Sequence, residues 1–172
     1  MNVDVASQHL HHDPRMAAEL ELEAARWAEI MALVDLLTPQ ERVVPGYYRE
    51  PDWTVKDLIV HLGFWHGEAR SELLKIATRM YNPHDFEVER RNAEILAAHR
   101  RDAWDLVWGQ AIASRAWMLE AVFGLHDQSP SATQWVRKAG AEHYGEHLDR
   151  LQAWTVELID LRTRPWMDER DP

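Results

Sequence analysis

The sequence has 172 residues, of which 46% are hydrophobic and 28% are charged, and we expect residues 1–172 to form a single domain with a buried core. The formal net charge of −10, from 29 acidic and 19 basic residues, argues against nucleic acid or an anionic membrane as the main partner. Cysteine is absent, whereas histidine occurs ten times and tryptophan nine times. A metal ion would therefore be held by imidazole and carboxylate, and thiol chemistry would need a thiol from outside.

The elements predicted from hydrophobic periodicity are all helical, and the first covers residues 14–37. Asp13 is placed to cap this helix, and Pro14 suits the first helical position. Apolar residues spaced by three or four line one face of it: Met16, Leu20, Ala24, Trp27, Met31 and Val34. The proline-containing stretch from 39 to 53 is predicted to be a loop.

The second predicted helix covers residues 54–78. Thr54 and Asp57 have the spacing of a capping box, with aspartate in the place of the usual glutamate. The apolar face of this helix is formed by Val55, Leu58, Leu62, Trp65, Ala69, Leu73 and Ile76.

Residues 79–101 are predicted to be a long connection that contains a short helix over 87–99. A third long helix is expected over 103–125 and a fourth over 132–161. The apolar stripe of the fourth helix includes Gly140 and two histidines. These patterns predict an all-α fold, a four-helix bundle with a long crossover connection between the second and third long helices.

The two ends of the chain, 1–12 and 163–172, are expected to be flexible tails. No segment has the pattern of a targeting sequence, and no apolar run approaches the roughly 20 residues that cross a bilayer. We therefore expect a cytoplasmic protein with no membrane partner.

The most informative pattern is formed by His143 and His147, which lie one turn apart on the face that should point into the bundle. Burying two imidazoles is unfavourable unless their ring nitrogens find partners, and a metal ion would satisfy both rings. The alternative is a pair of histidines that are hydrogen-bonded within the core.

His61 is the third candidate ligand, at the inner edge of the apolar face of the second helix. One histidine from this helix and a pair from the last helix would provide three neutral ligands and leave coordination positions open, as in a catalytic site. The alternative is a half-buried histidine without a metal.

Two segments that contain these histidines resemble the DinB/YfiT-like superfamily. Residues 53–61 (WTVKDLIVH), continuing LGFW, are similar to its second-helix motif, and residues 142–151 (EHYGEHLDRL) are similar to its last-helix motif. The resemblance spans about residues 15–161. It implies a four-helix bundle, frequently a homodimer, in which His61, His143 and His147 bind a divalent metal ion, most often zinc or nickel.

The resemblance also implies two classes of activity. Members of the superfamily are transferases or isomerases that use a low-molecular-weight thiol such as mycothiol or bacillithiol, and the related ClbS-like proteins hydrolyse strained electrophilic rings. We expect a thiol-dependent enzyme that acts on an electrophilic small molecule. The alternatives are a metal-dependent hydrolase that acts in self-protection and a non-enzymatic, metal-stabilised protein that sequesters a ligand.

Other residues are assigned roles by their position relative to the histidines. Glu146 is the candidate general base, and a solvated helix-face residue is the alternative. Trp65 and Trp154 are candidate substrate-binding residues, with core packing as the alternative. His66 is predicted to point away from His61. Arg70 and Arg115 are equal candidates for binding a substrate carboxylate.

Overall fold

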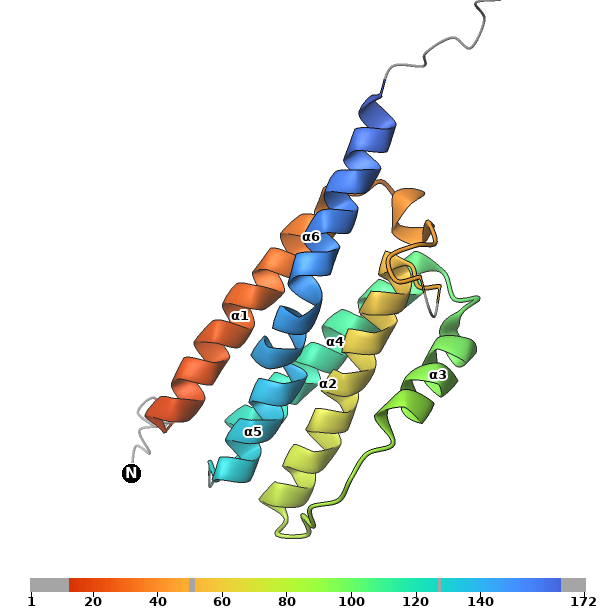
Figure 1. Ribbon diagram of the computed structural model, residues 1–172. Coiled ribbons are helices and arrows are strands. Elements are labelled where there is room, and N and C mark those ends of the chain that lie inside the picture. The colour runs from red at the N-terminus through yellow and green to blue at the C-terminus, as the bar shows by residue number, and fades with distance from the viewer. Residues whose placement is uncertain (1–12, 50–51, 127, 165–172) are drawn as a thin grey trace, which may run out of the picture.

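The computed structural model describes residues 13–49, 52–126 and 128–164, and within them the chain is all helical, as predicted. The expected tails lie outside the described residues, except that Thr163 ends the last helix. The elements, shown in Figure 1, are α1 (Pro14–Asp35), the 3₁₀ turn η2 (Glu41–Val43), α2 (Val55–Ala77), α3 (Val88–His99), α4 (Trp104–Phe123), α5 (Pro130–Ala139) and α6 (Ala141–Thr163).

Helices α1 and α2 begin where the capping residues predict. The Asp13 carboxylate accepts a hydrogen bond of 2.8 Å from the backbone N–H of Arg15. At α2, the backbone N–H of Asp57 donates to the Thr54 hydroxyl (3.1 Å), and the backbone N–H of Thr54 donates to the Asp57 carboxylate (2.8 Å). These reciprocal bonds satisfy two backbone N–H groups that have no partner within the helix. They fix where α2 begins and therefore which face of the helix His61 occupies.

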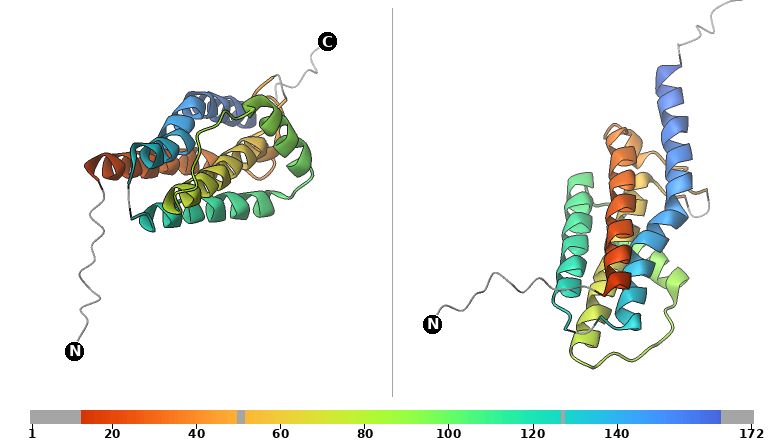
Figure 2. Two further views of the ribbon diagram at one scale, coloured as in Figure 1. Left: turned by 90° about the horizontal axis from the view of Figure 1, so that it is seen from below. Right: turned by 90° about the vertical axis from the view of Figure 1, so that its left-hand side faces the viewer.

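Helix α2 lies in the middle of the arrangement. It contacts α4 on one side, α5 and α6 on another, and α3 beside them, as the end-on view of Figure 2 shows. Helix α2 approaches α4 closely at Gly63, where an added Cβ would lie 3.0 Å from Cα of Ala111. Helix α1 packs along α6 and α5.

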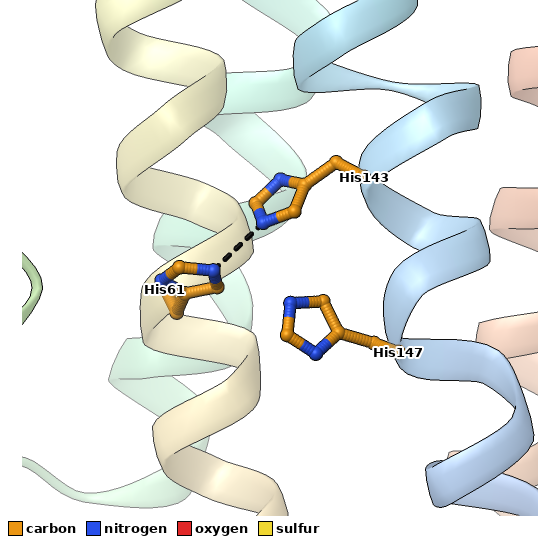
Figure 3. A group of neighbouring side chains, drawn as sticks. All are labelled: His61, His143 and His147. Carbon is orange, nitrogen blue, oxygen red and sulfur yellow. Dashed lines mark hydrogen bonds between the residues drawn. The ribbon is translucent and has the colours of Figure 1, made fainter. Parts of the chain in front are cut away.

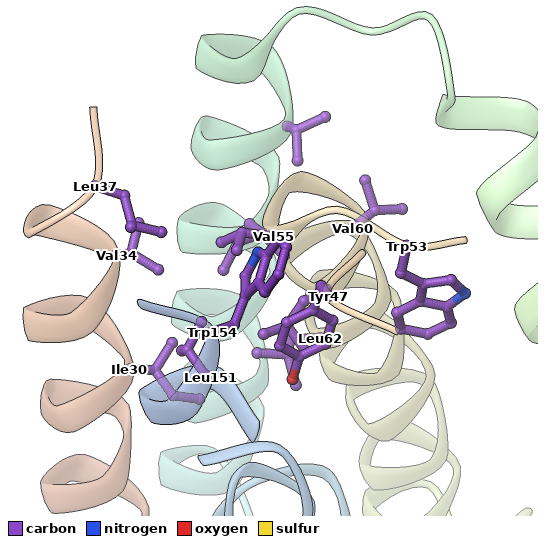
Figure 4. Packing of buried hydrophobic residues seen from close by; sticks show 14 of the residues in the cluster. Ile30, Val34, Leu37, Tyr47, Trp53, Val55, Val60, Leu62, Leu151 and Trp154 are labelled. Carbon is purple, nitrogen blue, oxygen red and sulfur yellow. The ribbon is translucent and has the colours of Figure 1, made fainter. Parts of the chain in front are cut away.

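A large buried cluster joins α1, the loop before α2, α2 and α6. Ile30 and Val34 of α1 face Leu151 and Trp154 of α6, and Leu62 comes from α2 (Figure 4). A second cluster, at the other end of α1, joins it to α2, α4 and α5 through Met16, Leu73, Met118, Val122 and Val136. The first cluster anchors α6 and the first part of α2, and the second cluster anchors the later part of α2, which gives the side chains between these helices fixed positions.

The single helix predicted over 132–161 is wrong, because the structure contains two helices that meet at Gly140. Helix α5 ends at Ala139, and α6 begins at Ala141. An added Cβ at Gly140 would lie 2.6 Å from Cγ of Glu23 and 2.7 Å from the Val136 carbonyl oxygen, so only glycine fits this junction. As a result, His143 lies in the first turn of a new helix rather than in the middle of a long one.

No helix in the described ranges is long and apolar enough to cross a membrane.

Candidate metal centre

The structure brings His61, His143 and His147 together between α2 and α6 (Figure 3). The Nε2 atoms of His61 and His143 are 2.7 Å apart, and one ring nitrogen from each of the three histidines lies within 4.8 Å of the others. All three side chains are buried, with 6–8% of each residue exposed. The predicted grouping of these residues is therefore present in the fold.

Burial keeps the three imidazoles neutral. The pKa of His61 is lowered from 6.5 to about 3, chiefly by desolvation and also by the nearby His147, while hydrogen bonding with Asn92 opposes the shift. Desolvation also lowers the pKa of His147 to about 4. The pKa of His143 is well below 6.5 because of desolvation and repulsion from the other two rings. Near pH 7 each ring therefore has a lone pair available for a metal ion.

The outer nitrogen of His147 has a partner in the loop that precedes α2. The Tyr48 hydroxyl lies 3.1 Å from Nδ1 of His147, and the neighbouring Tyr47 hydroxyl donates to the His147 backbone carbonyl at 3.3 Å. With Nδ1 bonded to Tyr48, the lone pair on Nε2 is the one directed at the other histidines. A partner of this kind fixes the orientation and tautomer of a ligating imidazole.

The donor set fits a divalent transition-metal ion. Three converging imidazole nitrogens suit zinc, nickel, copper or iron(II), and no carboxylate belongs to the group found among the described residues. Three neutral donors would leave positions of a tetrahedral or larger coordination shell free.

The three histidines form part of the wall of a cavity of about 610 Å³. Glu146 and Trp65, both predicted from the sequence as site residues, also line this cavity. Trp154 does not line it: its indole is buried in the core, with Cη2 placed 2.9 Å from where a Cβ of Gly46 would be, and the Arg150 guanidinium lies over its ring.

Several cavity residues were not predicted from the sequence. Tyr81 and Phe86 come from the connection between α2 and α3, Asn92 from α3, and Trp135 and Lys138 from α5. The two aromatic residues of the connection could have indicated a contact with the site, because large apolar side chains in an aperiodic segment usually cover a surface. Their partners could not be identified without the path of the connection.

A second buried polar group lies behind the histidines, and it includes His66, which has no exposed surface. The Tyr144 hydroxyl donates to Glu23 (2.9 Å) and lies 2.6 Å from Nε2 of His66, so the His66 N–H donates to Tyr144. Arg115 binds both oxygens of Glu23, at 2.7 and 2.6 Å. The guanidinium is thus held by a buried carboxylate and does not line the cavity, contrary to its candidate role in substrate binding.

No protein-family model matches the sequence, and neither a curated protein nor a solved structure matches the chain.

Proposed function

We propose that His61, His143 and His147 hold a divalent metal ion, zinc or nickel, and that the protein is a metal-dependent enzyme. The observation that carries the proposal is the convergence of three buried, neutral imidazoles at the wall of a large cavity. A bound ion would use the lone pairs of the Nε2 atoms of His61 and His143, which already lie 2.7 Å apart.

When bound, such an ion supplies positive charge that lowers the pKa of a coordinated thiol or water. We propose that the co-substrate is a low-molecular-weight thiol such as mycothiol or bacillithiol, which attacks an electrophilic small molecule in an S-transferase or isomerase reaction. The lack of cysteine in the chain is consistent with a thiol supplied from outside. The resemblance to the DinB/YfiT-like superfamily supports the same choice.

The side chains around the proposed ion have separate roles. Glu146 lines the cavity, directly precedes His147 in α6 and is exposed, so it can accept or deliver a proton during the reaction. Trp65 lines the cavity and contacts the His61 ring, with ring centroids 6.5 Å apart, and it would contact the substrate. We assign Trp154 a packing role instead of the predicted substrate contact.

A metal-dependent hydrolase that destroys a reactive electrophile is the second candidate. It uses the same histidines and cavity, with water in place of the thiol. The third candidate is a metal-stabilised protein that binds and sequesters a ligand without turnover.

One set of reactions separates the three candidates. Zinc- or nickel-loaded protein is mixed with an electrophile such as styrene oxide or monochlorobimane, together with mycothiol, bacillithiol or no thiol. The proposal predicts product only with a thiol, and none with the His143→Ala/His147→Ala variant. Turnover without thiol would identify the hydrolase, and stoichiometric binding without turnover would identify the sequestering protein.

We further propose that the helices form a DinB-type four-helix bundle, in which α1, α2, α4 and the α5–α6 pair are the four members. Residues 78–103, including α3, would be the crossover connection. A homodimer and a cytoplasmic location remain part of this proposal. The dimer is supported by the outer face of α4, whose exposed apolar residues include Leu106, Ile112, Trp117 and Phe123.

A further inference from the structure

We propose that the cavity beside the three histidines binds a flat aromatic group of the substrate. This inference rests on the proposed function, because it requires the reacting end of the substrate to lie at a metal ion held by the histidines. The inference is supported by a continuous series of aromatic rings that leads from the histidines along the cavity. We call these rings the aromatic wall: Trp53, Trp65, Tyr81, Phe86 and Trp135.

The aromatic wall begins at the candidate metal ligands. The Trp53 and His61 ring centroids are 5.2 Å apart, and those of His61 and Trp65 are 6.5 Å apart. From Trp65 the wall continues to Phe86 at 5.9 Å, and from Phe86 to Trp135 at 5.4 Å. A ligand that extends from the histidines into the cavity therefore meets ring surface along its length.

The rings of the wall come from four separate parts of the chain. Trp53 precedes α2, Trp65 belongs to α2, Trp135 belongs to α5, and Tyr81 and Phe86 belong to the connection after α2. Apart from Trp53, these side chains are only partly buried although they line a concave surface. Partly exposed aromatic surface in a concavity of several hundred cubic ångströms is typical of a small-molecule site, because a ligand removes that surface from water.

Contacts within the wall show the geometry in which its indoles hold an aromatic ring. The phenyl ring of Phe86 lies between the indoles of Trp65 and Trp135, at interplanar angles of 69° and 79°. Edge-to-face contacts of this kind are the preferred geometry between aromatic rings. The neighbouring cavity surface presents the same ring types to a ligand.

The polar groups of the wall favour a ring over a sugar or a peptide. The indole N–H of Trp65 donates to the Asn92 side chain (3.1 Å), and that of Trp135 donates to the Tyr81 hydroxyl (3.3 Å). These two donors are therefore occupied, and the indoles offer ring surface to a ligand. The charged lining residues Lys138, Asp85 and Glu146 have mixed signs, so charge alone does not select the ligand.

Two hydroxamates test the inference. Acetohydroxamate and 2-naphthohydroxamate have the same metal-binding group and differ in the attached methyl or naphthyl group. Calorimetric titration of zinc-loaded protein should show that the naphthyl compound binds at least about 30-fold more tightly, because its ring buries aromatic surface. In Trp135→Ala, this ratio should fall to about threefold or less.

Two further variants control the measurement. Phe86→Ala changes the wall outside any helix and should also reduce the ratio, which guards against a folding defect of Trp135→Ala. Trp117→Ala removes an indole that is 53% exposed on α4 and does not line the cavity, so its ratio should match that of the wild type.

The possible failures are distinguishable. If both hydroxamates bind the wild type with equal affinity, or if the ratio is unchanged in both wall variants, the aromatic substrate class is wrong while the open metal site stands. If neither compound binds the zinc-loaded protein, the proposed function fails and this inference fails with it.

Discussion

Tyr47 and Tyr48 both reach His147, but they contact different atoms of it. The Tyr48 hydroxyl lies 3.1 Å from Nδ1 of the ring, whereas the Tyr47 hydroxyl bonds the backbone carbonyl. Tyr48→Phe should therefore lower zinc affinity by about 10-fold or more, because a ligating imidazole loses the partner that orients it. Competition with a chromophoric chelator measures this affinity.

Tyr47→Phe is the matched control for that experiment. It removes a hydroxyl bound to the backbone, so it should lower the free energy of unfolding by about 1 kcal/mol and leave zinc affinity within about threefold of the wild type. Equal zinc affinities in the two variants would contradict an orienting role for Tyr48.

The buried histidines also predict how the stability of the metal-free protein depends on pH. His61, His66 and His147 have pKa values of about 3, 3 and 4 in the folded chain, against 6.5 when unfolded. Below pH 6.5 the unfolded chain therefore binds more protons, and stability is lost as pH falls from 6.5 toward 4, at about 1.4 kcal/mol per pH unit for each histidine. Stability should be complete above about pH 6.5.

Thermal unfolding of the metal-free protein between pH 7.5 and 5 checks this prediction. The midpoint should be constant in the upper part of the range and should fall steeply below pH 6.5. In His147→Gln, stability should fall less steeply with decreasing pH, because one fewer proton is taken up on unfolding. A midpoint that stays unchanged down to pH 5 would show that these rings are not buried in the neutral form.

At the scale of residues, the sequence predicted the three converging histidines but not their surroundings. The pattern worked for His143 and His147 because a spacing of four places two side chains on one helix face. The pattern gave no prediction that His66 is buried, because it assumes one buried face, whereas α2 is covered on several sides. Trp154 fitted the stripe equally well, but its position under Gly46 depends on how a loop folds over the helix.

The junction between α5 and α6 sets the position of the histidine pair. Gly140→Ala should lower the free energy of unfolding by about 2–4 kcal/mol, because its methyl group would meet Glu23 and the Val136 carbonyl. It should also weaken zinc binding, since His143 follows the junction by less than one turn of helix. Denaturant titration and zinc competition measure the two effects.

Gly67→Ala provides a matched control in the interior of α2, where an added Cβ has no neighbour within 4 Å. Alanine is the better helix former, so this variant should gain about 0.5–1 kcal/mol. If Gly140→Ala proved as stable as Gly67→Ala, the close packing at the junction would be wrong.

At the scale of elements, periodicity and capping residues predicted α1, α2, α3 and α4 to within two residues at their described ends. The last helix was predicted as one because its apolar stripe continues through Gly140. A glycine in such a stripe is compatible with both a helix interior and a helix end. The choice depended on the close approach of Glu23 from α1, which is a tertiary contact that no local pattern contains.

The molecule as a whole has an apolar outer face on α4 that predicts self-association. Leu106, Trp117 and Phe123 are each about half exposed there. Sedimentation equilibrium should give twice the mass of one chain, and Trp117→Glu should shift the protein toward the monomer because a charge would be buried at the interface. Glu68→Gln, at a partly exposed position of α2, should leave the mass unchanged.

A dimer that persists in Trp117→Glu would place the interface elsewhere on the surface. A wild-type monomer would contradict the homodimer itself. Neither result would change the predicted metal content, because the three histidines belong to one chain.

Metal content tests the central claim most directly. The wild type, the His143→Ala/His147→Ala variant and the control His126→Ala, which changes an exposed histidine, are loaded with zinc, dialysed and analysed by plasma emission spectroscopy. We expect about one zinc ion per chain in the wild type and in His126→Ala, and close to none in the double variant. Equal zinc content in all three proteins would contradict a metal centre formed by His61, His143 and His147.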